Sequence, residues 1–250
     1  MAAPALVALA SGSTDPRAHA TVTAIVDEVR AVRGDLRIEQ AFVDAPARRR
    51  GSLASVSDAL VRAGHEEVVL VPLLLAESPE TTATIEDAVA TLRERHPGLR
   101  VQATPVLGLE ACFLQVLDVR LREALRAARV RELDALVLAA VGSTDAISNQ
   151  AVARLARVWG AHHKLPVTAA YAQAAPPAAG EAVRAFRAEG RRHIAVASLF
   201  LTPGPHADRA AELALEAGAV AVADPLGAHP EVARTVLARY AVGAVELVPV

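Results

Sequence analysis

Short apolar runs alternate with longer amphipathic segments along the whole chain. Runs that are apolar at nearly every position are typical of strands buried on both faces of a parallel sheet, whereas apolar residues three and four apart indicate helices. The pattern predicts strands at about residues 5–10, 37–43, 67–74, 100–103, 135–140, 167–171, 193–200 and 220–223. Each is followed by a predicted helix, at residues 18–33, 52–63, 82–95, 109–128, 148–163, 178–189, 206–216 and 230–240.

The tetrapeptide Gly-Ser-Thr-Asp occurs twice, at Gly12 to Asp15 and at Gly142 to Asp145, each time after an apolar run. The second halves also agree, because the apolar runs at 68–75 and 194–201 each follow a residue pair that ends in glycine, Gly64 or Gly190. A single long period predicts a duplicated domain. We therefore expect an α/β protein of two tandem flavodoxin-like halves, 1–128 and 132–250, each with a doubly wound parallel sheet.

An eight-stranded barrel is the competing architecture, since eight strand and helix units are what such a barrel requires. Two halves are favoured because the similarity has one long period rather than eight short ones. The charged segment 126–134 also has the composition of a linker.

Composition narrows the classes of partner. The 250 residues are 53% hydrophobic, and 26 Lys and Arg stand against 28 Asp and Glu, so the net charge of -2 gives no reason to expect nucleic acid or an anionic membrane. The basic run Arg48 to Arg50 is the local exception, either a solvated loop face or an anion site. The single cysteine, Cys112, excludes an internal disulfide and a cysteine zinc site. The first ten residues lack a basic start to a signal peptide, which predicts a cytoplasmic protein.

Candidate chemistry lies in the turns that follow the strands, because ligands of open parallel sheets bind beyond the carboxyl ends of the strands. These turns cover residues 11–17, 76–82, 141–148 and 202–209. A Gly-Ser-Thr-Asp turn at a helix start presents amides and hydroxyls that suit carboxylate or phosphate oxygens. The same residues are also a common helix N-cap, so capping and binding both remain open.

The ordered motifs resemble the sirohydrochlorin chelatases of the CbiX and SirB type in their long fused form. In the first half these motifs are Gly-Ser-x-Asp-Pro-Arg-Ala at 12–18, Ala-Phe-Val-Asp at 41–44, Val-Pro-Leu-Leu-Leu at 71–75 and Pro-Val-Leu-Gly at 105–108. In the second half they are Ala-Ala-Val-Gly-Ser-Thr-Asp at 139–145, Leu-Thr-Pro-Gly at 201–204 and Asp-Pro-Leu-Gly-Ala-His-Pro at 224–230. The resemblance implies insertion of Co, Fe or Ni, as a divalent metal ion, into a tetrapyrrole in a cleft between two flavodoxin-like halves.

The sequence departs from that family at its metal-site histidines. Where the resemblance implies histidines, this chain has Ser11, Val141 and Glu80, and only His206 remains, at the repeat offset of 126 residues from Glu80. Imidazole and carboxylate both bind such metals and both transfer protons, so Glu80 and His206 are the candidate catalytic and metal-binding residues. We expect the two to face one shared cavity. The alternative is that Glu80 is a solvated loop residue and that His206 begins a helix without binding a ligand.

The candidate substrate-binding residues are those of the two repeated turns, namely Ser11, Gly12, Ser13, Asp15, Gly142, Ser143 and Asp145. For the remaining histidines structural roles are expected: capping or packing for His229, and a favourable interaction with the helix dipole for His162 and His163.

Three classes of function stay open. They are a chelatase-like lyase or another metal-dependent enzyme, a module that binds a tetrapyrrole or metal without turnover, and a paralogue that partners an active chelatase. The expected ligand is a small tetrapyrrole-like molecule, and because the duplication already supplies two walls, the sequence is compatible with function as a monomer.

Overall fold

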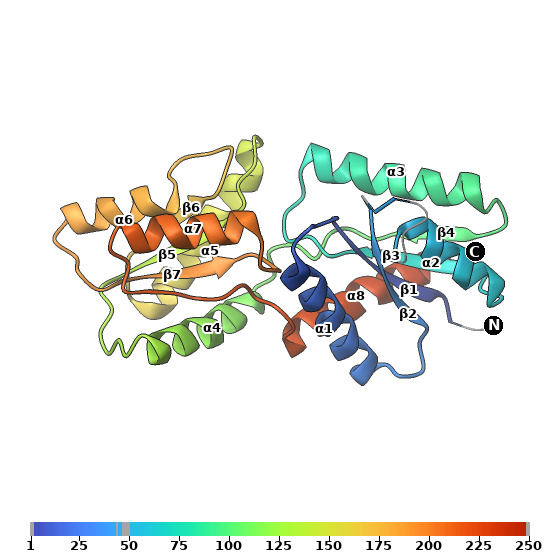
Figure 1. Cartoon of the computed structure of the whole chain (residues 1–250), viewed down its shortest axis with the longest axis horizontal. Coiled ribbons are helices and arrows are strands. Elements are labelled where there is room, and N and C mark those ends of the chain that lie inside the picture. Colours follow the sequence, from blue (N-terminus) through green and yellow to red (C-terminus); the bar gives the residue numbers. More distant parts are fainter. Residues whose placement is uncertain (1–2, 44, 47–50, 249–250) are drawn as a thin grey trace. The chain divides into compact units, whose positions relative to one another are not determined.

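The computed structural model describes residues 3–43, 45–46 and 51–248, and in these ranges strands and helices alternate as the sequence predicts. The strands form two separate four-stranded sheets rather than one closed barrel, and every strand pair is parallel (Figure 1). The expectation of two flavodoxin-like halves is confirmed. Asp44 and the basic run Arg48 to Arg50 lie outside the described residues.

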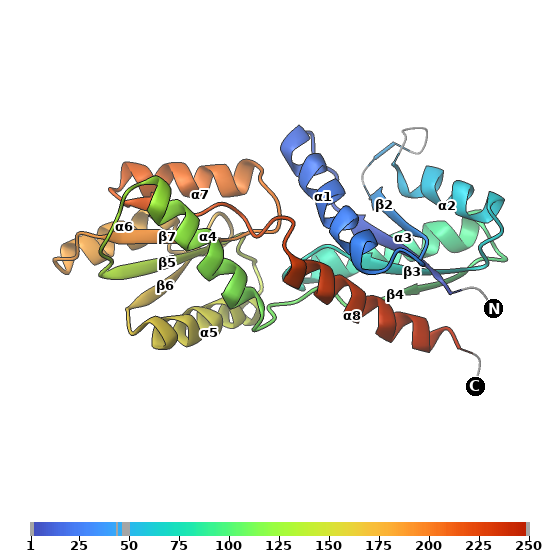
Figure 2. The same cartoon turned by 90° about the horizontal axis from the view of Figure 1, so that it is seen from below.

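The first sheet has the strand order β2-β1-β3-β4, from β1 (Ala5–Ala10), β2 (Ile38–Phe42), β3 (Glu67–Pro72) and β4 (Arg100–Ala103). Helices α1 (Pro16–Val32) and α8 (Pro230–Glu246) pack together on one face, and α2 (Leu53–Arg62) and α3 (Pro79–Arg95) pack together on the other (Figure 2). Every residue of β1 is buried, as a strand covered on both faces must be.

The second sheet repeats this order as β6-β5-β7-β8, from β5 (Ala135–Ala140), β6 (Val167–Tyr171), β7 (Ile194–Leu199) and β8 (Ala221–Val222). Helices α6 (Ala179–Ala188) and α7 (Pro205–Glu216) share a core with alternate residues of β5 and β7. Helices α4 (Phe113–Ala127) and α5 (Ala146–His163) complete the fold, α4 against β7 and β8 and α5 against β5 and β6.

The boundaries of the two compact units differ from those predicted. Unit 1 comprises residues 1–108 together with 228–250, and unit 2 comprises residues 109–227. The compact units therefore do not follow the predicted halves 1–128 and 132–250, because helix α4 packs on the second sheet while the C-terminal helix α8 returns to β3 and β4 of the first. Gly243 of α8 shows how close this packing is, since a methyl group there would lie 2.7 Å from Val69 Cγ1 and 2.8 Å from Thr104 Cγ2.

Among the described residues, no helix combines the length and the apolar character needed to cross a membrane.

Candidate functional site

The first repeated turn joins β1 to α1 and leaves Ser11 and Gly12 exposed, with Ser13 and Asp15 half-buried. Asp15 is the N-cap of α1: its Oδ1 accepts a hydrogen bond from the Arg17 backbone N at 2.8 Å. The Arg17 guanidinium also binds this carboxylate, with Nη2 2.6 Å from Oδ2, and holds the pKa of Asp15 below its usual value. The predicted capping role is confirmed for Asp15.

Gly12 and Ser13 line a cavity of about 720 Å³ within unit 1. Its other walls come from α1, β2 and α2, including His19, whose ring centroid lies 4.2 Å from that of Phe42. Gln40 also lines the cavity, and its buried Oε1 has no hydrogen-bond partner among the described residues. A buried acceptor without a donor is uncommon in folded proteins.

The second repeated turn is held by hydrogen bonds to the side chains of Asp145 and Asn149. Asp145 caps α5 by accepting from the backbone N of Ile147 at 3.2 Å and of Ser148 at 2.9 Å, and from Ser148 Oγ at 2.7 Å. The Ser148 hydroxyl is the main reason why the pKa of Asp145 lies below its usual value. Asn149 closes the turn, accepting from the Ser143 backbone N at 3.0 Å and donating to the Ser143 carbonyl at 2.7 Å.

Gly142 is required by the path of this turn. Its φ is +87°, a region that favours glycine, and a methyl group there would lie 2.1 Å from the Gln173 carbonyl oxygen and 2.9 Å from Tyr171 Cβ. The turn after β5 therefore approaches the chain beyond β6 at backbone distance. Asp145 and Gly142 thus have structural roles that hold without any ligand.

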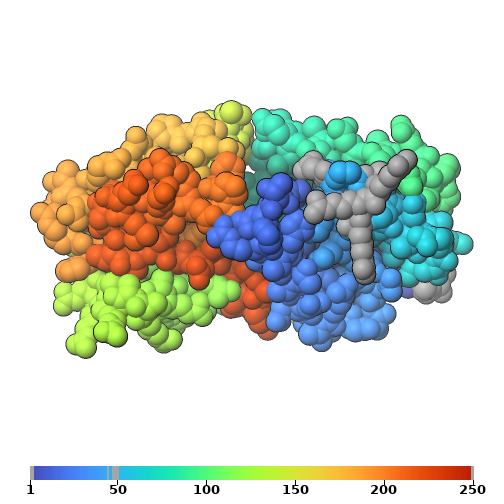
Figure 3. Space-filling model, in the orientation of Figure 1, coloured from blue at the N-terminus to red at the C-terminus, as the bar shows by residue number. Residues whose placement is uncertain are grey.

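Glu80 and His206 occupy equivalent positions in the two units. Helices α3 and α7 follow the equivalent strands β3 and β7, each begins at a proline, and Glu80 and His206 are the second residues. Both are exposed, and α7 lies at the surface in Figure 3 (orange-red). The prediction that Glu80 lies in a loop before a helix that starts at residue 82 is wrong. Ser78 caps α3, and the helix begins at Pro79, three residues earlier than predicted. A carboxylate in a first turn is also favoured by the helix dipole.

The two residues lie in different units, Glu80 in unit 1 and His206 in unit 2. That they act on one ligand stays a prediction.

The structural roles predicted for His229 and for the pair His162 and His163 compare differently with the structure. His229 is the N-cap of α8 and its Nδ1 accepts from the Glu231 backbone N at 3.2 Å, which confirms the predicted capping. His162 and His163 end α5 as predicted, but with Asp118 of α4 they form a group of potential metal ligands that sequence reasoning missed. The adjacent histidines were visible in the sequence, whereas their partner lies 45 residues upstream of His163.

Three solved chelatase structures share the fold of this chain. SirB from Bacillus subtilis with Fe³⁺ is 18% identical, with a TM-score of 0.77 over 97% of this chain and 96% of that one. SirB from Bacillus subtilis subspecies spizizenii in complex with cobalt is 16% identical, with a TM-score of 0.78 over 98% and 97%. CbiX, described as the terminal enzyme of siroheme biosynthesis in denitrifying bacteria, is 18% identical, with a TM-score of 0.68 over 98% and 100%. The protein therefore has the two-unit chelatase fold.

The family follows from the sequence itself. The sequence model of the CbiX family matches residues 5–124 and again residues 135–242, which together span most of the chain and coincide with the two repeats. The chain belongs to the CbiX family. A search of curated protein sequences found no match.

Proposed function

We propose that this protein is a chelatase-like lyase that binds sirohydrochlorin or a related tetrapyrrole and inserts a divalent metal ion, with low turnover. The observation that carries the proposal is the match to the CbiX family over both repeats. Insertion replaces two pyrrole protons by one metal ion, so M²⁺ and the free macrocycle give the metallated macrocycle and two protons. A chelatase must therefore hold the metal and accept protons near it.

His206 and Glu80 are assigned these two tasks. Imidazole and carboxylate are ligands for Co²⁺, Fe²⁺ and Ni²⁺, and both groups accept protons at neutral pH. Their exposure and their position at the start of helices that follow central strands suit groups that contact a ligand. The Ser11 to Asp15 and Gly142 to Asp145 turns are assigned to the substrate.

We expect low turnover because Ser11 and Val141 occupy positions at which the family resemblance implies histidines. Ser11 offers a weaker ligand, and Val141 offers none. Val141 is 40% exposed and Ile147, in the first turn of α5, is 71% exposed. The absence of a metal ligand at Val141 favours the second candidate, a protein that binds a tetrapyrrole without inserting metal.

The experiment separates binding from turnover. Absorption titration with sirohydrochlorin measures binding, and insertion of Co²⁺, Fe²⁺ or Ni²⁺ is measured against a protein-free baseline for the wild type, His206→Ala and Glu80→His. We expect tetrapyrrole binding, slow insertion that His206→Ala lowers by about 10²-fold or more, and faster insertion by Glu80→His.

His193→Ala is the matched control. His193 immediately precedes β7 and His206 follows it, and both are exposed. The hydrogen bonds that the structure gives His193 use its backbone, which donates to Asp134 Oδ1 and accepts from the Asp134 backbone N. Its removal should leave insertion unchanged. Binding without turnover would establish the second candidate, whereas robust insertion that survives His206→Ala would refute the assignment of the metal role to His206. Neither binding nor turnover would refute both candidates.

A further inference from the structure

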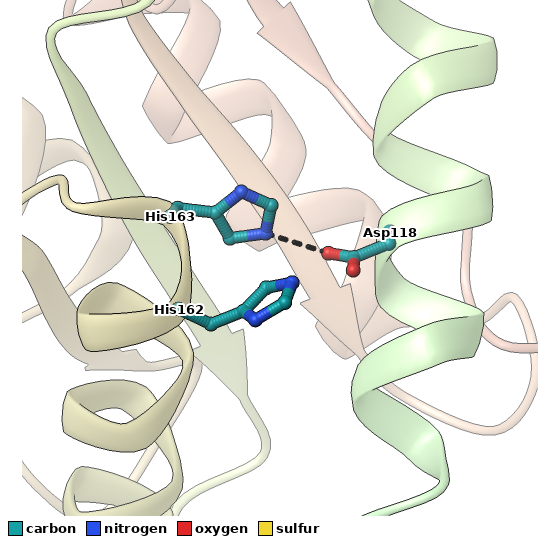
Figure 4. Close-up of side chains that lie close together, drawn as sticks. All are labelled: Asp118, His162 and His163. Atoms are coloured by element: carbon teal, nitrogen blue, oxygen red, sulfur yellow. Dashed lines mark hydrogen bonds and ion pairs between the residues drawn. The ribbon is translucent and has the colours of Figure 1, made fainter.

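A carboxylate and two imidazoles gather in unit 2, away from the turns assigned above. Asp118 lies in α4, and His162 and His163 are the last two residues of α5. One potential ligand atom from each of the three lies within 4.8 Å of the others. Figure 4 shows both rings on the side of α5 that faces Asp118.

The Asp118 carboxylate is held in place by hydrogen bonds to one of its two oxygens. His163 Nε2 and Trp159 Nε1 both hydrogen-bond to Oδ1 at 2.7 Å, the indole as donor. Within the part of the chain that the structure describes, Oδ2 receives no hydrogen bond. The Asp118 and His163 side chains are 20% and 27% exposed, so they are held by packing yet reached by solvent. A metal-ligating carboxylate is commonly fixed in this way by an outer hydrogen-bond donor.

A similar pair in unit 1 shows what a purely structural aspartate looks like. Asp58 also lies 3.0 Å from a histidine, His96, but Arg95 donates to both of its oxygens at 2.7 Å. The Arg95 guanidinium is the main reason why the pKa of Asp58 lies below its usual value. Among the described residues no arginine takes that place at Asp118, and Arg122 Nε donates to the Asp118 backbone carbonyl at 3.0 Å.

We propose that Asp118, His162 and His163 form a binding site for a divalent transition-metal ion of the Zn²⁺, Co²⁺ and Ni²⁺ class. Two imidazoles and one carboxylate are a donor set that these ions prefer over Mg²⁺ or Ca²⁺. Ligand atoms at about 2.0–2.2 Å from a tetrahedral ion stand roughly 3.4 Å apart, so a small rotation of the exposed His162 ring brings the set together. The partial negative charge at the C-terminus of α5 also favours a cation.

Metal binding changes the bond between His163 and Asp118. For Nε2 to bind the ion through its lone pair, the neutral imidazole of His163 carries its proton on Nδ1, so the Nε2 hydrogen bond to Asp118 is given up and both residues bind the ion instead. Asp118 then binds through one of its oxygens while Trp159 keeps its bond to the carboxylate. The ion thus bridges α4 and α5.

Trp159 is the only tryptophan in the chain and gives a local optical probe. Its ring centroid lies 5.3 Å from that of His163, so a paramagnetic ion bound by these residues quenches its fluorescence. The experiment titrates untagged full-length protein with Co²⁺ or Ni²⁺, and then adds Zn²⁺ as a competitor. We expect saturable quenching that fits a single ion bound beside Trp159, reversed by Zn²⁺.

Asp118→Asn and His162→Ala should each raise the dissociation constant by at least about 10-fold. His162 is exposed and the structure gives its side chain no hydrogen bond, so its removal tests the metal without loosening the contact between the helices. His206→Ala is the control that separates this site from the proposed chelatase function, and it should leave the quenching curve unchanged.

Quenching that is absent, that does not saturate, or that is equal in the wild type and both cluster variants would overturn the proposal. Quenching lost in His206→Ala but retained in His162→Ala would do the same, because it would move the ion to the residue assigned to metal insertion.

Discussion

Replacing Gly142 by alanine tests the geometry of the second repeated turn most directly. The new methyl group would lie 2.1 Å from the Gln173 carbonyl oxygen and 2.9 Å from Tyr171 Cβ. A backbone carbonyl cannot rotate away as a flexible side chain can, so the turn and the chain after β6 must separate. In addition, alanine at a φ of +87° is strained.

The magnitude follows from these two contributions. Positive φ costs a non-glycine residue about 1–2 kcal/mol, and a forced shift in packed structure costs about 1–3 kcal/mol. We therefore expect Gly142→Ala to lower the free energy of unfolding of unit 2 by about 2–5 kcal/mol.

Gly190→Ala is the matched control in the same unit. Gly190 has nearly the same φ, +92°, but a methyl group there meets nothing within 4 Å. It should therefore lose only the contribution of backbone strain, about 1–2 kcal/mol. The difference between the two variants isolates the close approach of the turn to Gln173.

The assay is urea denaturation followed by Trp159 fluorescence. Trp159 is fully buried and lies in unit 2 together with both substitution sites, so its signal reports unfolding of the relevant part of the chain. The linear dependence of stability on denaturant gives the free energy for each variant. If Gly142→Ala loses no more stability than Gly190→Ala, the close approach described above is wrong.

Two further predictions concern a cap and a helix. Asp145→Ala should destabilise unit 2 more than Asp145→Asn, because asparagine keeps a capping oxygen. The pKa of Asp145 in the folded protein is lowered, chiefly by the Ser148 hydroxyl. The stabilisation by its charge is therefore complete above about pH 4 and is lost as the pH falls through the folded pKa. Denaturation at pH 7 and pH 3 should show wild type and Asp145→Asn converging in acid, and a constant gap would contradict this. Gly243→Val should cost unit 1 about 1–3 kcal/mol through contact with Val69 and Thr104, seen by amide hydrogen exchange of α8, while the Trp159 transition keeps its midpoint. A Trp159 transition shifted as far as α8 exchange would argue against placing α8 in unit 1.

Most of the fold was predictable from the sequence because its signals are local. A fully apolar six-residue run such as β1 identifies a strand buried on both faces, and a Ser-Thr-Asp turn before a helix identifies a cap, as Asp15 and Asp145 confirm. The duplication can also be recognised in the sequence, because Gly-Ser-Thr-Asp recurs at 12–15 and at 142–145. Glu80 and His206 were found in this way, and the structure confirms that they are equivalent.

The tertiary structure decided which sheet each helix covers and which side chains meet. Because the two sheets are copies, both offer similar apolar faces, and an amphipathic pattern such as that of α8 does not state which face it will cover. Only long-range packing, such as that of Gly243 on Val69, assigns the helix to unit 1. The Asp118 cluster and the approach of Gly142 to Gln173 depend on residues far apart in sequence, so no periodicity or spacing could reveal them.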